Sequence, residues 1–378
     1  MNEQQYSIDT RTLRPGDIFI PIKGPNFDGH DFISEAMRKG ASQIIDRPIG
    51  QLAKKYRKKL TCPIIAITGS SGKTTLKDML VAILSQHYKV TATHENQNNE
   101  IGVPLTILNT DARTEILILE LGMRQKGDLD FLTKIVRPTH VVITNIGKSH
   151  YEFFQSIKKI AQAKSEVLLK PLQSEGQRKA YLNISSNQYA FLEKKAKANQ
   201  FMIYPFQGDT GIDQMMNICH LISQEFGVSS AQMREAISSF EGSSHRMNRF
   251  QVGGVTVIDD AYNSNPDGVR YALHFFKALS GRKLCVLGDM LELGEIAESE
   301  HANLEEAILD AGVSIVFAFG PLMKALQSDH IDVLHFEDKS SMHEALLAEL
   351  KSGDRLLIKG SRGMKLEETV DAVSVFFK

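Results

Sequence analysis

Short apolar runs alternate with amphipathic helical patterns along most of the chain. Strands are predicted at residues 18–22, 43–45, 64–67, 116–119, 140–144, 255–258, 284–287, 315–319 and 355–358. Apolar runs of this length, separated by helical patterns, are typical of α/β domains with parallel sheets. The pattern therefore predicts an α/β fold throughout.

The strands and helices group into three predicted domains. Residues 1–62 hold a turn, two strands and a helix over residues 31–39, which is too little for a roomy domain, so we expect this unit to dock on the next segment of the chain. Residues 63–243 form the predicted central domain, and residues 244–378 a Rossmann-like unit. A length of 378 residues fits two or three domains at roughly 100–200 residues each.

The strongest chemical signal is a glycine-rich loop between a strand and a helix. It reads Gly69, Ser70, Ser71, Gly72, Lys73, Thr74, Thr75. Glycines let backbone N–H groups turn toward a phosphate, the lysine adds charge, and a threonine hydroxyl can hold Mg²⁺. The strict phosphate-loop spacing fails, because Ile67 stands five positions before Gly72. A plain helix-capping turn is the alternative, and the flanking strand and helix argue against it.

A lysine interrupts the apolar face of a helix predicted over residues 156–169. Lys164 lies three and four positions after Ala161 and Ile160, among the apolar residues. Burial of an unpaired ammonium is costly, so such a lysine should lose its proton, find a partner or be modified, for example to a carbamate. The alternative is a side chain that reaches past the apolar face to solvent, and periodicity alone favours it.

Two further polar residues follow predicted strands. Glu120 ends the strand at 116–119, and His150 follows the strand at 140–144. Ligands of open parallel sheets gather at the carboxyl ends of the strands, where the glycine-rich loop also begins. Lys73, Thr74, Glu120 and His150 are therefore expected to meet at one nucleotide and Mg²⁺ site. Singly, Glu120 could be a surface acid and His150 a loop histidine.

Composition narrows the class of protein. Hydrophobic residues make up 42% and charged residues 24%, which excludes a disordered chain, a collagen and a coiled-coil rod. The net charge of −1 argues against a general nucleic-acid binder. Cys62, Cys219 and Cys285 are far apart, so a disulfide framework or zinc site is not expected. The polar first five residues do not resemble a secretion signal, and no apolar run could span a bilayer. We expect a soluble cytoplasmic protein.

Several motifs together resemble the Mur ligase family over nearly the whole chain. They are the loop at 67–75 (ITGSSGKTT), the Asn-rich stretch at 96–104 (NQNNEIGVP), Glu120 in ELGM at 120–123, the segment 145–150 ending in His150, and Lys164. In the last domain they are Arg246, 259–266 (DDAYNSNP), 287–294 (LGDMLELG) with His301, and 359–362 (KGSR). Near the start they are 9–11 (DTR) and 23–30. The family carbamylates the lysine that Lys164 matches, which reverses the preference for the solvent-reaching alternative.

The resemblance implies a three-domain architecture: a short N-terminal UDP-binding domain, a central phosphate-loop ATPase sheet and a C-terminal Rossmann-like ligase domain. It is strongest to the branch that adds a dipeptide. It implies an ATP-dependent ligase that joins D-alanyl-D-alanine to UDP-N-acetylmuramoyl-tripeptide through an acyl phosphate, in peptidoglycan precursor synthesis. It also implies ATP, Mg²⁺ and a carbamylated lysine as cofactors. We expect only small-molecule partners, no nucleic acid, no membrane span and a monomer.

The resemblance also assigns roles to residues of this sequence. Lys73, Lys164 and His150 would be catalytic, and Thr74, Glu120 and His150 would hold metal. The nucleotide would be bound by Gly69, Ser70, Ser71, Gly72, Lys73, Thr74, Thr75, Asn217, Arg246, Asp260, Asn263 and Asn265. The other substrates would be bound by Asp9, Thr10, Arg11, Lys23, Asp28, Gly29, His30, Asn98, Asn99, Lys359, Ser361 and Arg362.

The sequence departs from the family pattern in two places, the segment that would bind the UDP-sugar and the segment that would bind adenine. The UDP-binding segment is short, and Thr10 replaces the usual serine. The central domain is also shorter than usual before Asn217, which matches an adenine-side asparagine, and Asp213 stands where histidine is common. UDP-sugar and adenine binding are the functions that these departures would alter.

Two other functions fit the sequence less well. A related ligase that adds a single amino acid is disfavoured by the Asn-rich stretch and by the loop at 259–266. An inactive nucleotide-binding scaffold is disfavoured because Lys73, Glu120, His150 and Lys164 are all present. A scaffold would not need a second metal site.

Overall fold

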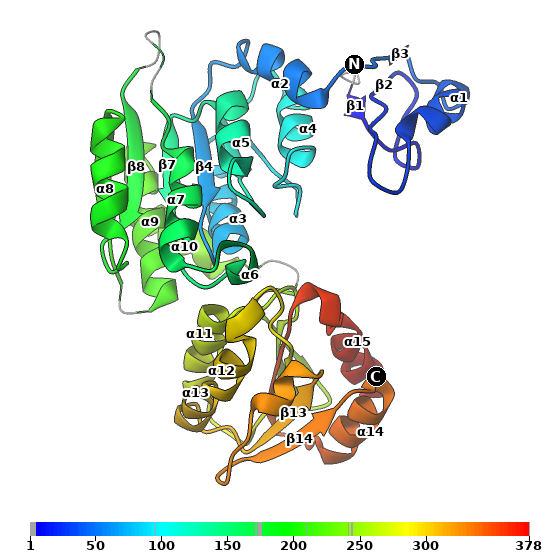
Figure 1. Cartoon of the computed structure of the whole chain (residues 1–378), viewed down its shortest axis with the longest axis vertical. Helices are drawn as coiled ribbons and strands as arrows, with labels where there is room; N and C mark the ends of the chain where they lie inside the picture. The colour runs from blue at the N-terminus through cyan, green and yellow to red at the C-terminus, as the bar shows by residue number, and fades with distance from the viewer. Residues whose placement is uncertain are drawn as a thin grey trace.

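The computed structural model describes residues 5–94, 96–170, 172, 176–208, 210–240, 242 and 245–377. These residues form three sheets with helices around them (Figure 1). The predicted boundary at 243/244 and the first four residues, whose polar character argued against a secretion signal, lie outside the described residues. The α/β class and the three-part architecture are confirmed.

The N-terminal sheet is small and parallel, with strand order β1-β2-β3. Its elements are β1 (Tyr6–Ser7), β2 (Ile18–Phe19), β3 (Gln43–Ile44), the 3-10 helix η1 (Gly29–Phe32) and α1 (Ile33–Arg38). The predicted strand at 18–22 was too long. Pro21 has no N–H to extend the ladder, and β2 ends at Phe19. The predicted helix at 31–39 is likewise shorter, because its first turn is 3-10.

The side chain of Asn109 joins this sheet to the central part. It accepts from the N–H of Tyr6 at 2.7 Å and donates to the carbonyl of Tyr6 at 2.9 Å. The helix α2 (Ile49–Arg57) packs on α4 (Gly102–Leu108) and α5 (Asp128–Val136) and shares the central core. The N-terminal unit is therefore docked on the central part, as expected from its size.

The central sheet is parallel, with strand order β5-β6-β4-β7-β8-β9. Its strands are β4 (Ile64–Thr68), β5 (Val90–Ala92), β6 (Ile116–Glu120), β7 (His140–Ile143), β8 (Arg178–Asn183) and β9 (Phe201–Phe206). Its other helices are α3 (Lys73–Leu84), α6 (Tyr151–Phe154), α7 (Ile157–Lys164), α8 (Tyr189–Ala198), α9 (Gly211–Glu225) and α10 (Ser230–Ser238).

Both faces of the central sheet are covered, which explains the continuous apolar runs. Ile64 and Ala66 of β4 belong to one apolar cluster, with α2, α4, α5 and α7. Ile65 and Ile67 belong to the other, with α3, α9 and α10. Because β4 lies between β6 and β7, the carboxyl ends of these three strands are adjacent. The sequence analysis predicted that Glu120 and His150 would meet at such an edge.

The helix predicted over residues 156–169 is interrupted. The α-helix α7 ends at Lys164, and the 3-10 helix η2 (Ser165–Val167) follows it. Lys164 is therefore at the last position of α7 rather than in the middle of a long helix. The tighter turn rotates the next residues, so that Val167 and Leu168 still reach the core.

The C-terminal sheet has strand order β10-β11-β15-β12-β13-β14. Among the strand pairs that the structure describes in this sheet, β10–β11 is antiparallel and the others are parallel. Its strands are β10 (Asn248–Val252), β11 (Val255–Asp260), β12 (Lys283–Gly288), β13 (Ile315–Phe319), β14 (Asp332–Phe336) and β15 (Arg355–Lys359). Its helices are α11 (Pro266–Lys277), η3 (Gly294–Ile296), α12 (Ala297–Ala302), α13 (Glu305–Asp310), η4 (Leu322–Ala325), α14 (Lys339–Glu349), η5 (Arg362–Met364) and α15 (Glu367–Phe376).

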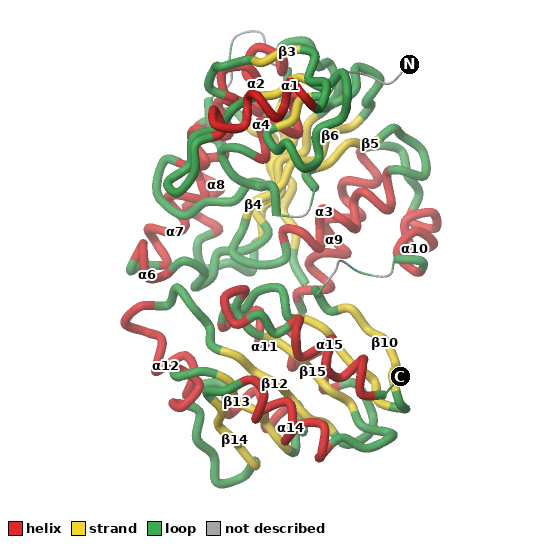
Figure 2. Tube along the Cα trace, turned by 90° about the vertical axis from the view of Figure 1, so that its right-hand side faces the viewer, coloured by secondary structure: helices red, strands yellow, loops and turns green. Residues whose placement is uncertain are grey.

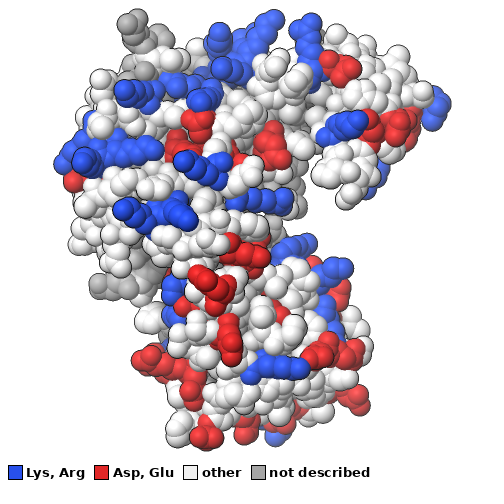
Figure 3. Space-filling model, in the orientation of Figure 1, with Lys and Arg blue, Asp and Glu red and all other residues white. Residues whose placement is uncertain are grey.

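The C-terminal part meets the central part at the carboxyl ends of the central strands (Figures 1 and 2). At this junction α9 and α11 are so close that a Cβ on Gly211 would lie 2.8 Å from the ring of Tyr271. In the space-filling view, acidic side chains gather on the C-terminal part and at the junction (Figure 3). No helix in the described ranges is long and apolar enough to cross a membrane.

A buried histidine on β7 makes the central domain sensitive to acid. His140 is only 7% exposed and packs against Tyr181 and Phe226. Burial lowers its pKa from 6.5 to about 4, assisted by the charge of Lys179 and opposed by Glu225. The unfolded chain takes up this proton near pH 6.5 and the folded chain does not. Stability is therefore complete above pH 6.5 and falls as the pH drops toward 4.

We expect the free energy of unfolding to fall by about 2 kcal/mol from this group between pH 6.5 and 5, at about 1.4 kcal/mol per pH unit. Urea unfolding of the parent and of His140→Phe at pH 7.5 and 5 measures it. Between pH 7.5 and 5, the free energy of unfolding of His140→Phe should fall by about 2 kcal/mol less than that of the parent. Equal acid losses in the two proteins would show that His140 does not take part.

Candidate functional site

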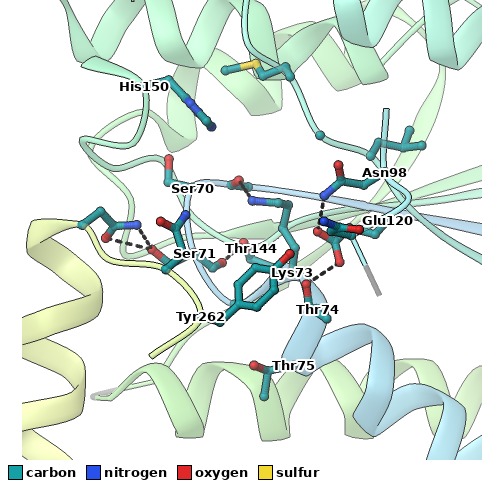
Figure 4. Close-up of a pocket in the computed structure, with 18 of the residues that line it drawn as sticks. Ser70, Ser71, Lys73, Thr74, Thr75, Asn98, Glu120, Thr144, His150 and Tyr262 are labelled. Carbon is teal, nitrogen blue, oxygen red and sulfur yellow. Dashed lines mark hydrogen bonds between the residues drawn. The ribbon is translucent and has the colours of Figure 1, made fainter. Parts of the chain in front are cut away.

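A large cavity lies between the central and C-terminal parts. Its volume is about 1290 Å³. The glycine-rich loop, the ends of β6 and β7, and loops after β11 and β15 line it (Figure 4). The carboxyl ends of the parallel strands of both sheets therefore face the same space, which is where ligands of such sheets bind.

The loop after β4 has a shape that only glycine allows at two positions. Gly69 has φ +148°, and a Cβ there would lie 1.9 Å from Oγ1 of Thr144. Gly72 has φ +77° and precedes α3, whose first turn has no side-chain cap. The unsatisfied N–H groups and the positive end of the helix favour an anion at this place.

Asn145, which the sequence did not single out as a site residue, supports the loop. Its Oδ1 accepts from the N–H groups of Ser70 at 3.0 Å and of Ser71 at 2.8 Å. The hydroxyl of Thr144 donates to the carbonyl of Ser71 at 2.7 Å, and Ser70 Oγ accepts from the N–H of Gly147 at 2.8 Å. The chain after β7 therefore sets the loop's conformation. The sequence signal for this role is a polar residue two positions after the buried strand β7, which pairs with β4.

Two lysine side chains share one backbone oxygen. Nζ of Lys73 and Nζ of Lys164 each lie 2.9 Å from the carbonyl oxygen of Gly69. Lys164 is 1% exposed, so the alternative in which it reaches solvent is wrong. Burial lowers the pKa of Lys164 well below its usual value, and the charge of Lys73 adds to this. Burial also lowers the pKa of Lys73, against the attraction of Glu120. The site therefore favours an anion, or a neutral amine on Lys164.

Glu120 forms a buried oxygen-rich pair with Thr74. The hydroxyl of Thr74 donates to Oε2 of Glu120 at 2.5 Å, and Nδ2 of Asn98 donates to Oε1 at 2.8 Å (Figure 4). Glu120 is 2% exposed. A buried carboxylate beside a hydroxyl, in a cavity with room for water and phosphate, fits a hard cation such as Mg²⁺. Among the described residues no group of three or more His, Cys, Asp and Glu side chains is arranged to hold a metal.

His150 enters the cavity from the other side of the loop. It precedes α6 with φ +59°, and its ring lines the cavity (Figure 4). Its Nδ1 lies 2.6 Å from Oε2 of Glu292, which comes from the C-terminal part. This contact lowers the pKa of the Glu292 carboxyl.

The C-terminal part contributes a second polar wall. Nζ of Lys359 donates to Oδ2 of Asp260 at 2.6 Å and to the carbonyl of Asn263 at 2.9 Å. Nδ2 of Asn265 lies 3.2 Å from Oγ of Ser71, so the glycine-rich loop is touched from this side. The Asn265 side chain also caps α11 through the N–H of Gly268. The start of α11 therefore fixes the position of the Asn265 side chain in the cavity lining.

Two arginines of the C-terminal part stack on one ring. The guanidinium of Arg246 lies 3.7 Å from the centroid of Tyr262, and that of Arg362 lies 5.3 Å from it. Arg362 also pairs with Glu367 at 3.0 Å. Both arginines line the cavity, so their charges are available to an anionic substrate.

Most of the predicted site residues line this one cavity. They are Gly69, Ser70, Ser71, Gly72, Lys73, Thr74, Thr75, Asn98, Asn99, Glu120, His150, Lys164, Arg246, Asp260, Asn263, Asn265, Lys359 and Arg362. Ser361 is buried next to it, where its Oγ accepts from the N–H of Leu291 at 2.9 Å. Asn217 is exposed on α9 and does not line the cavity, although its neighbours Met215 and Ile218 do. Asp213 closes a capping box with Thr210.

The N-terminal residues form separate polar pairs outside the cavity lining. Asp9 pairs with Arg11 at 2.6 Å, and Asp28 contacts Lys23 at 3.4 Å. His30 lies between Asp28 and Asp46, at 2.5 and 3.1 Å. Thr10 and Gly29 are buried. The structure does not bring these residues to the glycine-rich loop, whereas Ile8 beside them does line the cavity.

The sequence matches three family models. They are "Mur ligase family, catalytic domain" over residues 4–96, "Mur ligase middle domain" over residues 67–255 and "Mur ligase, glutamate ligase domain" over residues 245–362. The chain is 33% identical to a UDP-N-acetylmuramoyl-tripeptide–D-alanyl-D-alanine ligase of Bacillus subtilis, over 96% of this chain and 91% of that protein.

Solved structures agree with these matches. A MurF structure from Acinetobacter baumannii superposes with a TM-score of 0.88 at 26% identity, over 98% of this chain and 93% of that one. The MurF ligase of Thermotoga maritima, solved in complex with ADP, gives 0.85 at 25% identity, over 100% and 99%.

Loss of the Asn145 side chain should loosen the glycine-rich loop. Asn145→Ala removes the acceptor of two backbone N–H groups, each worth about 1 kcal/mol net. We expect ADP affinity to fall about 30-fold, since the two bonds together are worth about 2 kcal/mol and 1.4 kcal/mol is a factor of ten. Calorimetric titration with ADP measures it. Asn199→Ala is the matched control, because Asn199 donates to the carbonyl of Leu168 away from the cavity. Unchanged affinity in Asn145→Ala would contradict the supporting role.

Proposed function

The chain belongs to the Mur ligase family, and we infer that it joins D-alanyl-D-alanine to UDP-N-acetylmuramoyl-tripeptide with the cleavage of ATP to ADP and phosphate. One observation of the molecule carries this inference. The glycine-rich loop, the buried Glu120–Thr74 pair and side chains of the C-terminal part all face one cavity. Phosphoryl transfer to a carboxylate, followed by attack of an amine, needs these three elements together.

The reaction has two steps in this proposal. The terminal carboxylate of the tripeptide attacks the γ-phosphorus of ATP, the bond to the bridging oxygen breaks, and ADP leaves with that electron pair. The amine of D-alanyl-D-alanine then attacks the acyl carbon of the acyl phosphate, loses a proton and displaces phosphate. Lys73 and the N–H groups at the start of α3 hold the β- and γ-phosphates during the first step.

Thr74 and Glu120 are proposed to hold Mg²⁺ beside these phosphates. A magnesium ion there neutralises charge that develops on the transferred group. The support is their 2.5 Å contact in a buried place, with Asn98 fixing the second carboxylate oxygen. His150 is proposed as the protein ligand of a second Mg²⁺, because its ring lines the same cavity.

Lys164 is proposed to carry a carbamate. A neutral lysine amine adds to CO₂, and the loss of one proton leaves an anion. Its burial and its depressed pKa favour the neutral amine that this addition needs. The carbamate would turn the repulsion between Lys164 and Lys73 into attraction. It would also supply a negative charge for the second Mg²⁺.

The C-terminal part is proposed to exclude water from the acyl phosphate, which would otherwise hydrolyse. Asn265 already touches Ser71 across the junction, and Asp260, Asn263 and Arg246 line the same cavity. Lys359, Ser361 and Arg362 would bind the peptide or the dipeptide. Asn98 and Asn99 would bind the tripeptide end.

The N-terminal unit is proposed to hold the UDP-sugar through the residues around Asp9–Arg11 and Asp28–His30. The division into residues 1–62, 63–243 and 244–378, and the adenine role of Asn217, stay predictions. We further propose a monomer in the cytoplasm. The three separated cysteines support the compartment, because free thiols fit a reducing environment, and the monomer stays a prediction.

The direct test is phosphate release from ATP with UDP-N-acetylmuramoyl-tripeptide, with and without D-alanyl-D-alanine. We expect release only with both substrates, and a UDP-pentapeptide product by mass spectrometry. Release with a single amino acid in place of the dipeptide would assign the chain to a neighbouring ligase activity. ATP binding without release, whatever the acceptor, would favour a scaffold.

Removal of the Lys164 amine should stop turnover without unfolding the chain. We expect Lys164→Ala to lower kcat about 100- to 1000-fold, as the loss of a charge-stabilising group does. Acetate or formate should restore part of the rate by occupying the vacated space. Intact mass under bicarbonate checks the modification itself, and thermal unfolding is the control. A fully active Lys164→Ala protein without added carboxylate would rule out the carbamate.

A further inference from the structure

One loop of the C-terminal part reaches across to His150. It follows β12 and runs through Met290 to Gly294. The loop is fixed on its own side, because the N–H of Met290 donates to Nε2 of His301 at 2.9 Å and the N–H of Leu291 donates to Oγ of Ser361 at 2.9 Å. Glu292 is therefore presented from a rigid base.

The same loop docks on the start of α6 by main-chain contact. The N–H of Glu152 donates to the carbonyl of Glu292 at 2.9 Å. Gly294, with φ +55°, lies so close that a Cβ there would be 3.2 Å from Cα of Glu152. The main chain thus brings the Glu292 side chain to His150, with Nδ1 to Oε2 at 2.6 Å.

Both partners of this contact have strained backbones. His150 has φ +59° and Glu292 has φ +63°. A left-handed conformation costs an ordinary L-residue roughly 1–2 kcal/mol, and such strain persists where surrounding contacts determine it. Strain on the two sides of one interdomain contact indicates that the contact's geometry matters.

The chemistry of the pair is that of an oriented histidine. A carboxylate oxygen 2.6 Å from Nδ1 favours the tautomer with its proton on that nitrogen, restrains the ring and leaves Nε2 to bind a cation. The imidazole of His150 points into the cavity toward the glycine-rich loop (Figure 4). Glu292 lines the same cavity from the opposite part of the molecule.

We propose that Glu292 is a positioning residue, which holds His150 in its metal-binding orientation only when the C-terminal part is docked. This rests on the proposed function, in which His150 binds the second Mg²⁺. Docking and formation of the second metal site are then one event. The second cation is bound tightly only in the arrangement that excludes water.

A second interdomain contact serves as a comparison. Nζ of Lys148 lies 2.5 Å from Oε1 of Glu300, which is buried and also contacts Arg270 at 3.4 Å. This pair joins the same two parts of the molecule as the contact of His150 with Glu292. Glu300→Gln therefore weakens one interdomain ion pair but leaves the Glu292–His150 contact and the main-chain contact of Glu152 in place, so the parts stay docked.

The test is Mn²⁺ binding followed by electron paramagnetic resonance, with a non-hydrolysable ATP analogue and UDP-N-acetylmuramoyl-tripeptide. We expect the parent to bind two Mn²⁺ ions. In Glu292→Ala the second ion should bind 10- to 100-fold more weakly, the loss typical of a residue that orients a metal ligand. Glu292→Gln keeps an acceptor for the Nδ1 proton and should lose less. Glu300→Gln should bind the second ion like the parent.

Docking itself needs a separate readout. The chain has no tryptophan, so Phe153→Trp on α6, where Phe153 is 57% exposed beside the docked loop, gives a single reporter. Its fluorescence response to the analogue should persist in Glu292→Ala, because the main-chain contact of Glu152 remains. In steady-state assays kcat should fall while KM for ATP stays the same.

Three results would overturn the proposal: unchanged second-ion affinity in Glu292→Ala, an equal loss in Glu300→Gln, or a parent that binds no second ion. A parent without ligase activity that still binds two ions, with the second dependent on Glu292, would contradict the proposed function but not the positioning role. If the parent is active and binds two ions, but Glu292→Ala leaves the affinity of the second ion unchanged, the positioning role is contradicted and the proposed function stands.

Discussion

The carbonyl oxygen of Gly69 accepts hydrogen bonds from two lysines, the buried Lys164 and the partly buried Lys73, and the rest of the site is arranged around this excess of positive charge. Two ammonium groups on one oxygen repel each other in a medium of low dielectric constant. They are stable together only if one is neutral or an anion lies between them. A phosphate chain at Lys73 and a carbamate on Lys164 both meet this requirement, and Glu120 supplies a fixed negative charge close to Lys73.

The position of that carbonyl is set by packing rather than by charge. Gly69 passes so close to Thr144 that no side chain fits there, and Asn145 holds the next two N–H groups. Both residues follow β7, the neighbour of β4 in the sheet. The strand order therefore decides which side chains support the loop. Contacts that restrain the loop in this way reduce the entropy cost of binding a nucleotide.

The second half of the site belongs to another core. The C-terminal sheet turns the ends of its own strands toward the same cavity, and Asn265 and Glu292 reach Ser71 and His150 across the junction. A reactive acyl phosphate requires water to be excluded while substrates still enter and leave. A site at the junction of two parts allows water to be excluded when the parts are together and substrates to pass when they are apart. In the positioning role proposed for Glu292, docking of the two parts would also set the orientation of His150.

The sequence by itself determined the α/β class, the strands at β4, β6 and β7, and the glycine-rich loop, because apolar runs and glycine spacing are local properties. It also placed Lys164 on an apolar face. It could not show whether that amine reached solvent, since its partner Gly69 is 95 positions away. It missed β8, which begins with Arg178 and Lys179, because their charges hide a strand whose residues are mostly buried. Only the tertiary structure decided the Asn145 support, the exposed place of Asn217 and the contact of His150 with Glu292. Each depends on which strand ends and loops become neighbours, and that depends on the order of strands in a sheet and the docking of two cores, which no local pattern encodes.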